Sequence, residues 1–352
     1  MTLPTITQNA APRPPHDDRL AQAGLCSLCP KLCRPTCPVQ NGTGRESAAP
    51  WRISDAVVRG VADGWTLPLA EQVAQCTGCG ACGEPCLPGT NLPEESRAAR
   101  AAAAEAGALL PAAERLRERI AATGSPRRVR RPARAGTRGG AGDLARGSGR
   151  AATVLLAGCP APDEVEEAAL ALFAAAGEEV RTVDACCGAV AEDLGLAPEA
   201  AALRAGWDEA VGGADVVVAS PSCARRLGAH TAVEWLAERL DRLAFEPVGG
   251  AVAWHAPCTL TRVLGVTEAP LRILAALGVE VREPAATGRR TRCSGAGAAY
   301  PLVDREGAEA VAAVRRAELA ALGAPVVTAC PSAARALDAT ELLVLAAGRL
   351  AR

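Results

Sequence analysis

The sequence contains few aromatic residues, one lysine and no long hydrophobic run. Trp, Tyr and Phe make up 2% of the 352 residues, and Lys31 is the only lysine. We attribute the excess of alanine and arginine to codon usage in a GC-rich genome. No apolar stretch reaches the roughly 18 residues that a membrane-spanning helix needs. The N-terminus has no apolar core of a secretory signal. We therefore expect a cytoplasmic protein, with any membrane contact made through partners at the inner face.

The chain also has no large excess of positive or negative charge. The formal net charge is −1, which argues against a dedicated nucleic-acid binder, so no nucleic-acid partner is expected. Apolar residues make up 49% of the chain, enough to bury a full-sized core. At roughly 150 residues per domain, the length predicts two to three domains.

Cysteine, by contrast, is abundant. Fifteen cysteines occur, an odd number that excludes complete pairing into intramolecular disulfides. Eight lie between Cys26 and Cys86, seven lie between Cys159 and Cys330, and none lies between these groups. In a cytosolic protein such clusters point to metal or redox chemistry.

These cysteine groups and the composition divide the chain. We expect a disordered tail at 1–22, a first cysteine domain at 23–122 and two related C-terminal units at 151–247 and 248–352. The segment 123–150 has eight arginines and one acid, with many glycines, and predicts a flexible basic linker. Its charge could contact RNA, lipid or an acidic partner, but a solvated tether is the favoured interpretation.

Helical patterns dominate the N-terminal part, and strands alternate with helices in the C-terminal part. Helices are expected at 51–61 and at 94–120, the latter interrupted near Gly107 and Pro111. Apolar runs followed by helical segments predict parallel βα units. The expected strands are 153–157, 179–183, 215–219, 251–255, 279–282 and 325–328; the expected helices are 163–176 (capped by Asp163), 198–211, 270–277 and 303–322.

The C-terminal pattern occurs twice. The segment 216–227 aligns with 326–337 without a gap, and Cys159 and Cys258 are 99 positions apart. An internal duplication of about a hundred residues is the simplest account. The predicted fold class is α+β: a helical N-terminal domain with two clusters, followed by two α/β repeats with parallel strands.

The first cysteine group has the spacing of bacterial ferredoxins. Cys76, Cys79, Cys82 and Cys86 follow the C-x2-C-x2-C-x3-C pattern of a [4Fe–4S] site, with Pro88 just beyond. The partner run is Cys26, Cys29, Cys33 and Cys37, with one extra residue between its second and third cysteines. Lys31 lies inside that loop and could raise a cluster potential by its charge.

In two-cluster ferredoxins the fourth cysteine of each run ligates the other cluster. This predicts Cys26, Cys29, Cys33 and Cys86 at one cluster, and Cys76, Cys79, Cys82 and Cys37 at the other. A pair of zinc sites is the alternative, although four-cysteine zinc sites usually pair two C-x2-C knuckles across a longer gap.

The second cysteine group repeats an incomplete motif. The first unit has Cys159, Cys186-Cys187-Gly188 and Cys223; the second has Cys258, Cys293-Ser294-Gly295 and Cys330. This arrangement resembles the CCG cysteine-rich domain of heterodisulfide reductase subunits and of the iron–sulfur subunits of glycolate oxidase and lactate utilisation complexes. The resemblance extends from about Cys26 to Leu337, apart from the linker. It implies that these seven cysteines are candidate metal ligands.

The chain departs from this family at several positions. The first unit has four cysteines, with Ser220 where a fifth might stand, so it could hold a third iron–sulfur cluster. The second unit has Ser294 and Ala333 at two ligand positions, and could be empty or hold an incomplete cluster. A redox disulfide that includes Cys186 or Cys187 is the alternative chemistry. His255, three residues before Cys258, could donate a hydrogen bond to a cluster or carry a proton.

By resemblance, the chain would be an iron–sulfur electron-transfer subunit and not a stand-alone enzyme. It would take electrons from a flavoprotein dehydrogenase of a 2-hydroxy acid such as glycolate or lactate, and pass them to a quinone or another carrier. The first alternative is a disulfide-cleaving protein like heterodisulfide reductase. The second is an iron–sulfur regulatory or binding protein.

Overall fold

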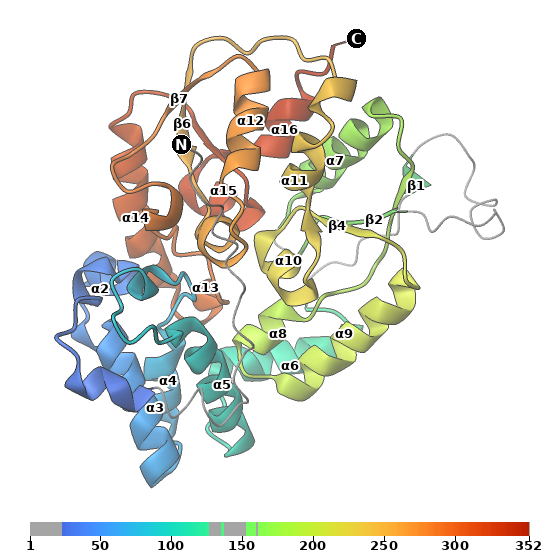
Figure 1. The fold of residues 1–352 in the computed structure, drawn as a ribbon. Helices are drawn as coiled ribbons and strands as arrows, with labels where there is room; N and C mark the ends of the chain where they lie inside the picture. Colours follow the sequence, from blue (N-terminus) through green and yellow to red (C-terminus); the bar gives the residue numbers. More distant parts are fainter. Residues whose placement is uncertain (1–22, 127–134, 137–152, 160, 352) are drawn as a thin grey trace, which may run out of the picture.

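The computed structural model describes residues 23–126, 135–136, 153–159 and 161–351. A helical N-terminal region (blue to teal in Figure 1) precedes two units that each contain a parallel sheet. We call these units repeat one and repeat two. This arrangement confirms the predicted α+β class. No helix in the described residues is long and apolar enough to cross a membrane.

The N-terminal region is built from short helices joined by cysteine-bearing loops. Its buried contacts come from small and aliphatic side chains such as Ile53, Val57 and Val73. The predicted break in the helical segment 94–120 is confirmed, because one helix ends at Glu105 and the next starts at Pro111. The helix Leu67–Ala74 was not predicted. The helices are α2 (Pro38–Thr43), α3 (Pro50–Asp63), α4 (Leu67–Ala74), α5 (Leu92–Glu105) and α6 (Pro111–Thr123).

Repeat one forms a sheet with strand order β1-β3-β2-β4-β5, in which all strands but β1 run parallel. Its strands are β2 (Thr153–Leu156), β3 (Val180–Thr182), β4 (Val216–Val218) and β5 (His230–Thr231). Its helices are α7 (Asp163–Ala175), α8 (Ala189–Asp193), α9 (Ala197–Val211), α10 (Pro221–Leu227) and α11 (Ala232–Ala237).

Repeat two has the strand order β7-β6-β8-β9, all parallel, which matches β3-β2-β4-β5 and agrees with an internal duplication. Its strands are β6 (Ala251–His255), β7 (Glu280–Arg282), β8 (Val326–Thr328) and β9 (Thr340–Glu341). Its helices are α12 (Glu268–Ala276), α13 (Tyr300–Val303), α14 (Arg305–Ala320), α15 (Pro331–Leu337) and α16 (Leu342–Ala347), with a π-helical turn at Thr259–Val263.

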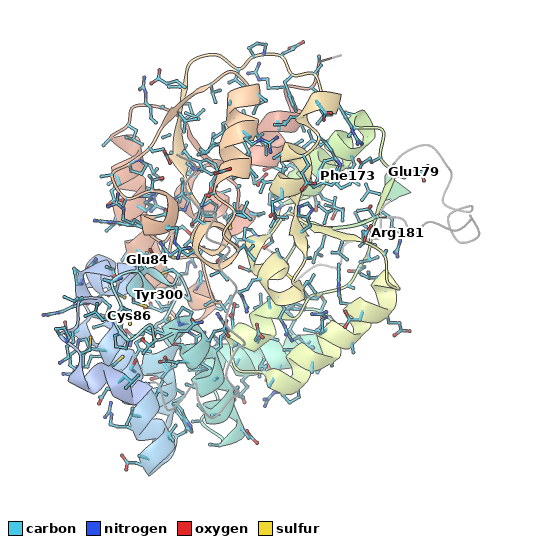
Figure 2. The ribbon with its side chains drawn as sticks, viewed as in Figure 1. Glu84, Cys86, Phe173, Glu179, Arg181 and Tyr300 are labelled. Carbon is cyan, nitrogen blue, oxygen red and sulfur yellow. The ribbon has the colours of Figure 1, made fainter. Side chains whose placement is uncertain are left out.

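One hydrophobic core joins the two repeats. Helix α7 of repeat one packs on α16 of repeat two, and α11 of repeat one packs on α12 of repeat two. The pairs are equivalent when the repeats are exchanged, as an internal duplication implies. Phe173 stacks on Trp235 inside this core, with ring centroids 3.6 Å apart (Phe173 is labelled in Figure 2).

The N-terminal region contacts both repeats. Helix α2 packs on α14 of repeat two, and α5 and α6 pack on α8 of repeat one. At the edge of this interface Arg289 donates to Glu84, which Figure 2 labels, at 2.9 Å. The cysteine loops of the N-terminal region therefore lie against the repeats rather than on a separate tethered domain.

Parts of the expected organisation differ or lie outside the described residues. The tail 1–22 and most of the linker are not described. Inside the expected linker, β1 (Ala135–Gly136) pairs with β3. Helix α7 has Pro162 at its N-cap, so the expected cap by Asp163 was wrong.

The start of α11 provides a test of local stability. The hydroxyl of Thr231 accepts a hydrogen bond from the Glu234 backbone N–H, and the Glu234 carboxylate accepts one from the Thr231 N–H. Thr231→Ala removes this capping box and is expected to lower the free energy of unfolding by about 1 kcal/mol. Urea unfolding of the two proteins measures the difference; an unchanged midpoint would contradict it.

Candidate metal and redox centre

The cysteines of both repeats lie beyond the carboxyl ends of parallel strands. Cys159 follows β2, Cys258 follows β6 and Cys330 follows β8. Carboxyl ends of parallel strands face one edge of the sheet, where ligands bind in open α/β folds. The fold thus brings together cysteines that are far apart in the sequence.

The first N-terminal cavity combines both cysteine runs. Its lining includes Cys26, Cys29 and Cys33 from one run and Cys86 from the other, the four residues predicted for one cluster. Cys82 also reaches this cavity. Lys31 and Trp51 complete one wall, where the Lys31 ammonium lies 4.4 Å from the Trp51 ring centroid.

The second N-terminal cavity has the complementary set. Cys37 of the first run lines it together with Cys76, Cys79 and Cys82 of the second. The structure therefore groups the cysteines in the crossed-over way that the spacing predicts. Gly80 adopts the left-handed backbone conformation between Cys79 and Cys82, with φ of 71°, where a side chain would strain the turn.

The donor chemistry of both cavities fits iron–sulfur clusters. Five thiols line the first cavity and four line the second, because Cys82 reaches both. The Gly78 N–H donates to the Cys76 sulfur at 3.4 Å, the kind of contact that stabilises a thiolate ligand. Burial raises the pKa of Cys33 to about 11 and of Cys37 to about 12, so metal must displace protons on binding. In the described residues, no three His, Cys, Asp or Glu side chains already converge as a closed metal site.

Repeat one brings its four cysteines into one cluster of thiols. The sulfurs of Cys159 and Cys186 are 3.6 Å apart. Cys187 packs in one cluster with Cys223, and its interaction with the neighbouring Cys186 thiol leads the causes that hold the pKa of Cys187 well below the usual value. The four cysteines predicted to ligate a third cluster therefore lie next to one another.

Glycines allow this close approach of backbone and sulfur. A Cβ on Gly158 would lie 2.5 Å from the Ser220 Cβ, and one on Gly188 would lie 2.6 Å from the Ala200 carbonyl oxygen. The Gly188 N–H also donates to the Cys186 sulfur at 3.4 Å. The glycine of the Cys186-Cys187-Gly188 turn is therefore required by sterics as well as by its positive φ.

A cavity of about 270 Å³ adjoins these thiols. Cys159, Cys187 and Cys223 line it from repeat one, while Ala298 and Arg335 line it from repeat two. Buried Ser220, at the position where a fifth cysteine might stand, also faces it. The repeat-one thiols are therefore reachable from a cavity between the repeats.

Repeat two brings together fewer of its own cysteines but recruits one from the N-terminal region. Cys293 lies in one small cluster with Cys79, and Cys258 packs against that cluster. Cys330 lies apart, in a small apolar cluster with Leu319 and Ala333. Ser294 and Ala333 stand where the repeat-one counterparts are Cys187 and Cys223.

His255 is fully enclosed beside this site. Its Nδ1 accepts a hydrogen bond from the Arg315 Nε at 3.1 Å, which leaves Nε2 as the nitrogen that carries the hydrogen of the neutral ring. Burial, with the nearby charge of Arg315, holds the pKa of His255 well below its ordinary value. The hydrogen bond from Arg315 supports a structural role for His255, and the two roles expected of it toward a cluster, donating a hydrogen bond and carrying a proton, stay predictions.

Sequence patterns did not identify the arginines of the site. Arg100, Arg262 and Arg315 donate to backbone carbonyls or side chains around the cysteine loops. Thirty-seven arginines occur, and no motif distinguishes these three from the exposed ones. Their contacts in the folded protein distinguish these three arginines, and the sequence does not show those contacts.

Comparison with known proteins bears on these cysteines. The family model described as "Cysteine-rich domain" (CCG) matches residues 153–228 and again 252–338. Both repeats match the cysteine-rich domain. The two matched segments contain all seven C-terminal cysteines and all or most of strands β2, β3, β4, β6, β7 and β8.

A curated relative matches a smaller part of the chain. It is a "Probable membrane-anchored ferredoxin" of Chromohalobacter salexigens, 36% identical over 88 residues. The match covers 25% of this chain and 13% of the relative, so this chain spans only a small part of the relative's length. No solved structure matches the chain.

Proposed function

We propose that this chain is an iron–sulfur electron-transfer subunit with two [4Fe–4S] clusters in its N-terminal region. The cysteine-rich domain matches and the ferredoxin-named relative support an iron–sulfur electron-transfer protein. The observation that carries the finer proposal is the crossed-over grouping of eight cysteines in two adjacent cavities. Such clusters supply one-electron transfer, because their thiolate ligands hold the iron in place in both redox states.

In this proposal twelve of the fifteen cysteines hold the clusters of a relay. Cys26, Cys29, Cys33 and Cys86 would hold the cluster nearer the protein surface, because exposed Leu32 and Leu87 flank their cavity. Cys37, Cys76, Cys79 and Cys82 would hold the cluster nearer the repeats, since Cys79 packs against Cys293. Cys159, Cys186, Cys187 and Cys223 would hold a third cluster in repeat one.

The partners follow from the family resemblance. A flavoprotein dehydrogenase of a glycolate- or lactate-type 2-hydroxy acid would supply electrons, and a quinone or carrier protein would accept them. The chemistry on the organic substrate would then take place in the partner, and this chain would work from the cytoplasmic side.

One observation favours a second function. The cavity of about 270 Å³ between the repeats exposes three repeat-one thiols next to Arg335, a cation that could hold an anionic substrate. Such a cavity suits a protein that cleaves disulfides at repeat one. Ser220→Ala would impair a site that needs a fifth ligand, and would leave a simple relay unchanged.

Metal analysis tests the proposal directly. Anaerobically purified protein should contain about eight irons per chain for two clusters and about twelve if repeat one is loaded, at four per cube. Acid-labile sulfide should match the iron, and the reduced protein should give the EPR signal of interacting cubes. Bound zinc with little iron would overturn the proposal.

A further inference from the structure

Three thiols from distant parts of the chain meet at the interface between the N-terminal region and repeat two. Cys79 and Cys293 are 6% and 2% exposed, and half-buried Cys258 packs against them. Cys293 interacts electrostatically with both of the other thiols. This is the only described contact in which an N-terminal cysteine reaches a cysteine of a repeat.

Arg262 holds the two sides of this contact together. Its Nε donates to the Cys79 carbonyl at 2.7 Å, and its Nη1 donates to the Thr291 carbonyl at 2.6 Å. The loops touch elsewhere too, because a Cβ on Gly297 would lie 2.5 Å from the Thr77 carbonyl oxygen. The neighbouring thiols are therefore fixed relative to each other by backbone contacts.

The two thiols of the pair lie in the same small cluster of side chains. Cys258 packs against the cluster that contains Cys79 and Cys293, and the Arg262 guanidinium that binds the Cys79 carbonyl lies beside it. Two neighbouring thiols are the arrangement from which a disulfide forms.

Repeat two cannot supply an ordinary four-thiolate cluster site from its own residues. Cys258 and Cys293 are the counterparts of Cys159 and Cys186, whose sulfurs are 3.6 Å apart. Serine and alanine stand at the positions of the other two repeat-one ligands. The third nearby thiol, Cys79, belongs to the cluster proposed in the second N-terminal cavity.

We propose that Cys258 and Cys293 form a redox-active dithiol/disulfide pair that exchanges electrons with the N-terminal clusters through the contact at Cys79. This inference rests on the proposed function. In the reductive direction the Cys258–Cys293 sulfur–sulfur bond breaks, and the pair takes up two electrons and two protons to give two thiols. One electron comes from each of the two reduced clusters, which become oxidised. The pair would thus convert single electrons into a two-electron store.

An electron count on the full-length, iron-loaded protein tests this inference. The oxidised protein is titrated with titanium(III) citrate, and iron is measured on the same sample. Cys258→Ser and Cys293→Ser should each lower the uptake by about two electrons per chain, with iron unchanged. Cys330→Ser is the matched control: it removes the remaining repeat-two thiol, which lies outside the pair, and should leave the uptake unchanged.

Thiol trapping on the wild-type protein gives a second readout that does not depend on the variants folding. After poising in mixtures of oxidised and reduced dithiothreitol and alkylation, peptide mass analysis should find Cys258 and Cys293 linked in the oxidised sample and alkylated in the reduced one. Failure to find this linkage would overturn the inference, as would equal electron uptake by wild type and both pair variants.

The iron measurement separates this inference from the proposed function. Loss of about four irons in either pair variant would make these cysteines cluster ligands and overturn the inference alone. Wild-type protein with little iron would overturn the proposed function and the inference with it.

Discussion

Replacing Cys33 and Cys86 together by alanine is expected to remove about four irons per chain, one whole cube. The two residues are 53 positions apart in the sequence but line the same cavity with Cys26 and Cys29. Loss of two thiolates leaves that cavity with too few strong donors for a cube. The remaining cluster, held by the second cavity, should keep its iron and its EPR signal.

The informative comparison is the double variant Cys33→Ala/Cys37→Ala. These two residues are only four positions apart, yet they line different cavities. Each cluster loses one ligand, so both are expected to be depleted, by up to about eight irons in total. The reverse pattern, with about eight irons lost from Cys33→Ala/Cys86→Ala and about four from Cys33→Ala/Cys37→Ala, would mean that each cysteine run holds its own cluster, contrary to the crossed-over assignment.

The second large effect is expected at Arg100, whose side chain joins the N-terminal region to repeat one. It is 3% exposed and donates to the Asp193 carbonyl at 2.6 Å and to the Cys76 carbonyl at 2.7 Å, with a longer bond to Val73. Arg100→Met keeps much of the apolar volume but leaves buried carbonyls without a donor. Each unsatisfied group costs about 1–3 kcal/mol, so we expect a loss of about 3 kcal/mol in the free energy of unfolding.

Urea unfolding of the anaerobic, iron-loaded protein measures this loss. Arg115→Met on the exposed side of α6 is the matched control, because it makes the same chemical change without burial and should alter stability by less than about 0.5 kcal/mol. We also expect weaker iron retention in Arg100→Met, because the Cys76 carbonyl is released. Equal midpoints for the two variants would show that Arg100 does not secure the interface.

The elements that sequence patterns predicted best are those that depend on neighbouring residues. The β-branched run within 215–219 and the breakers around Gly107 and Pro111 predicted β4 and the gap between α5 and α6 within a few residues. The short strands β5 and β9, two residues each, were not predicted. Such short segments carry too little periodicity to be distinguished from loops, and they form because a neighbouring strand offers unpaired backbone groups.

The cysteines, too, combine features that the sequence predicted with contacts that only the tertiary structure showed. Spacing within each run, together with the ferredoxin pattern in which the fourth cysteine ligates the other cluster, predicted which thiols line a common cavity. It could not predict that Cys79 would meet Cys293 or that Arg262 would bind the Cys79 carbonyl, 183 residues away.

By itself the sequence determined the α+β class and the duplication, since these follow from local propensity and periodicity. The tertiary structure alone decided which thiols lie against repeat two, and which of the thirty-seven arginines donate to groups around the cysteine loops. The physical reason is that such contacts depend on how whole helices and sheets pack. The packing free energy is spread over many residues, and no single motif records it.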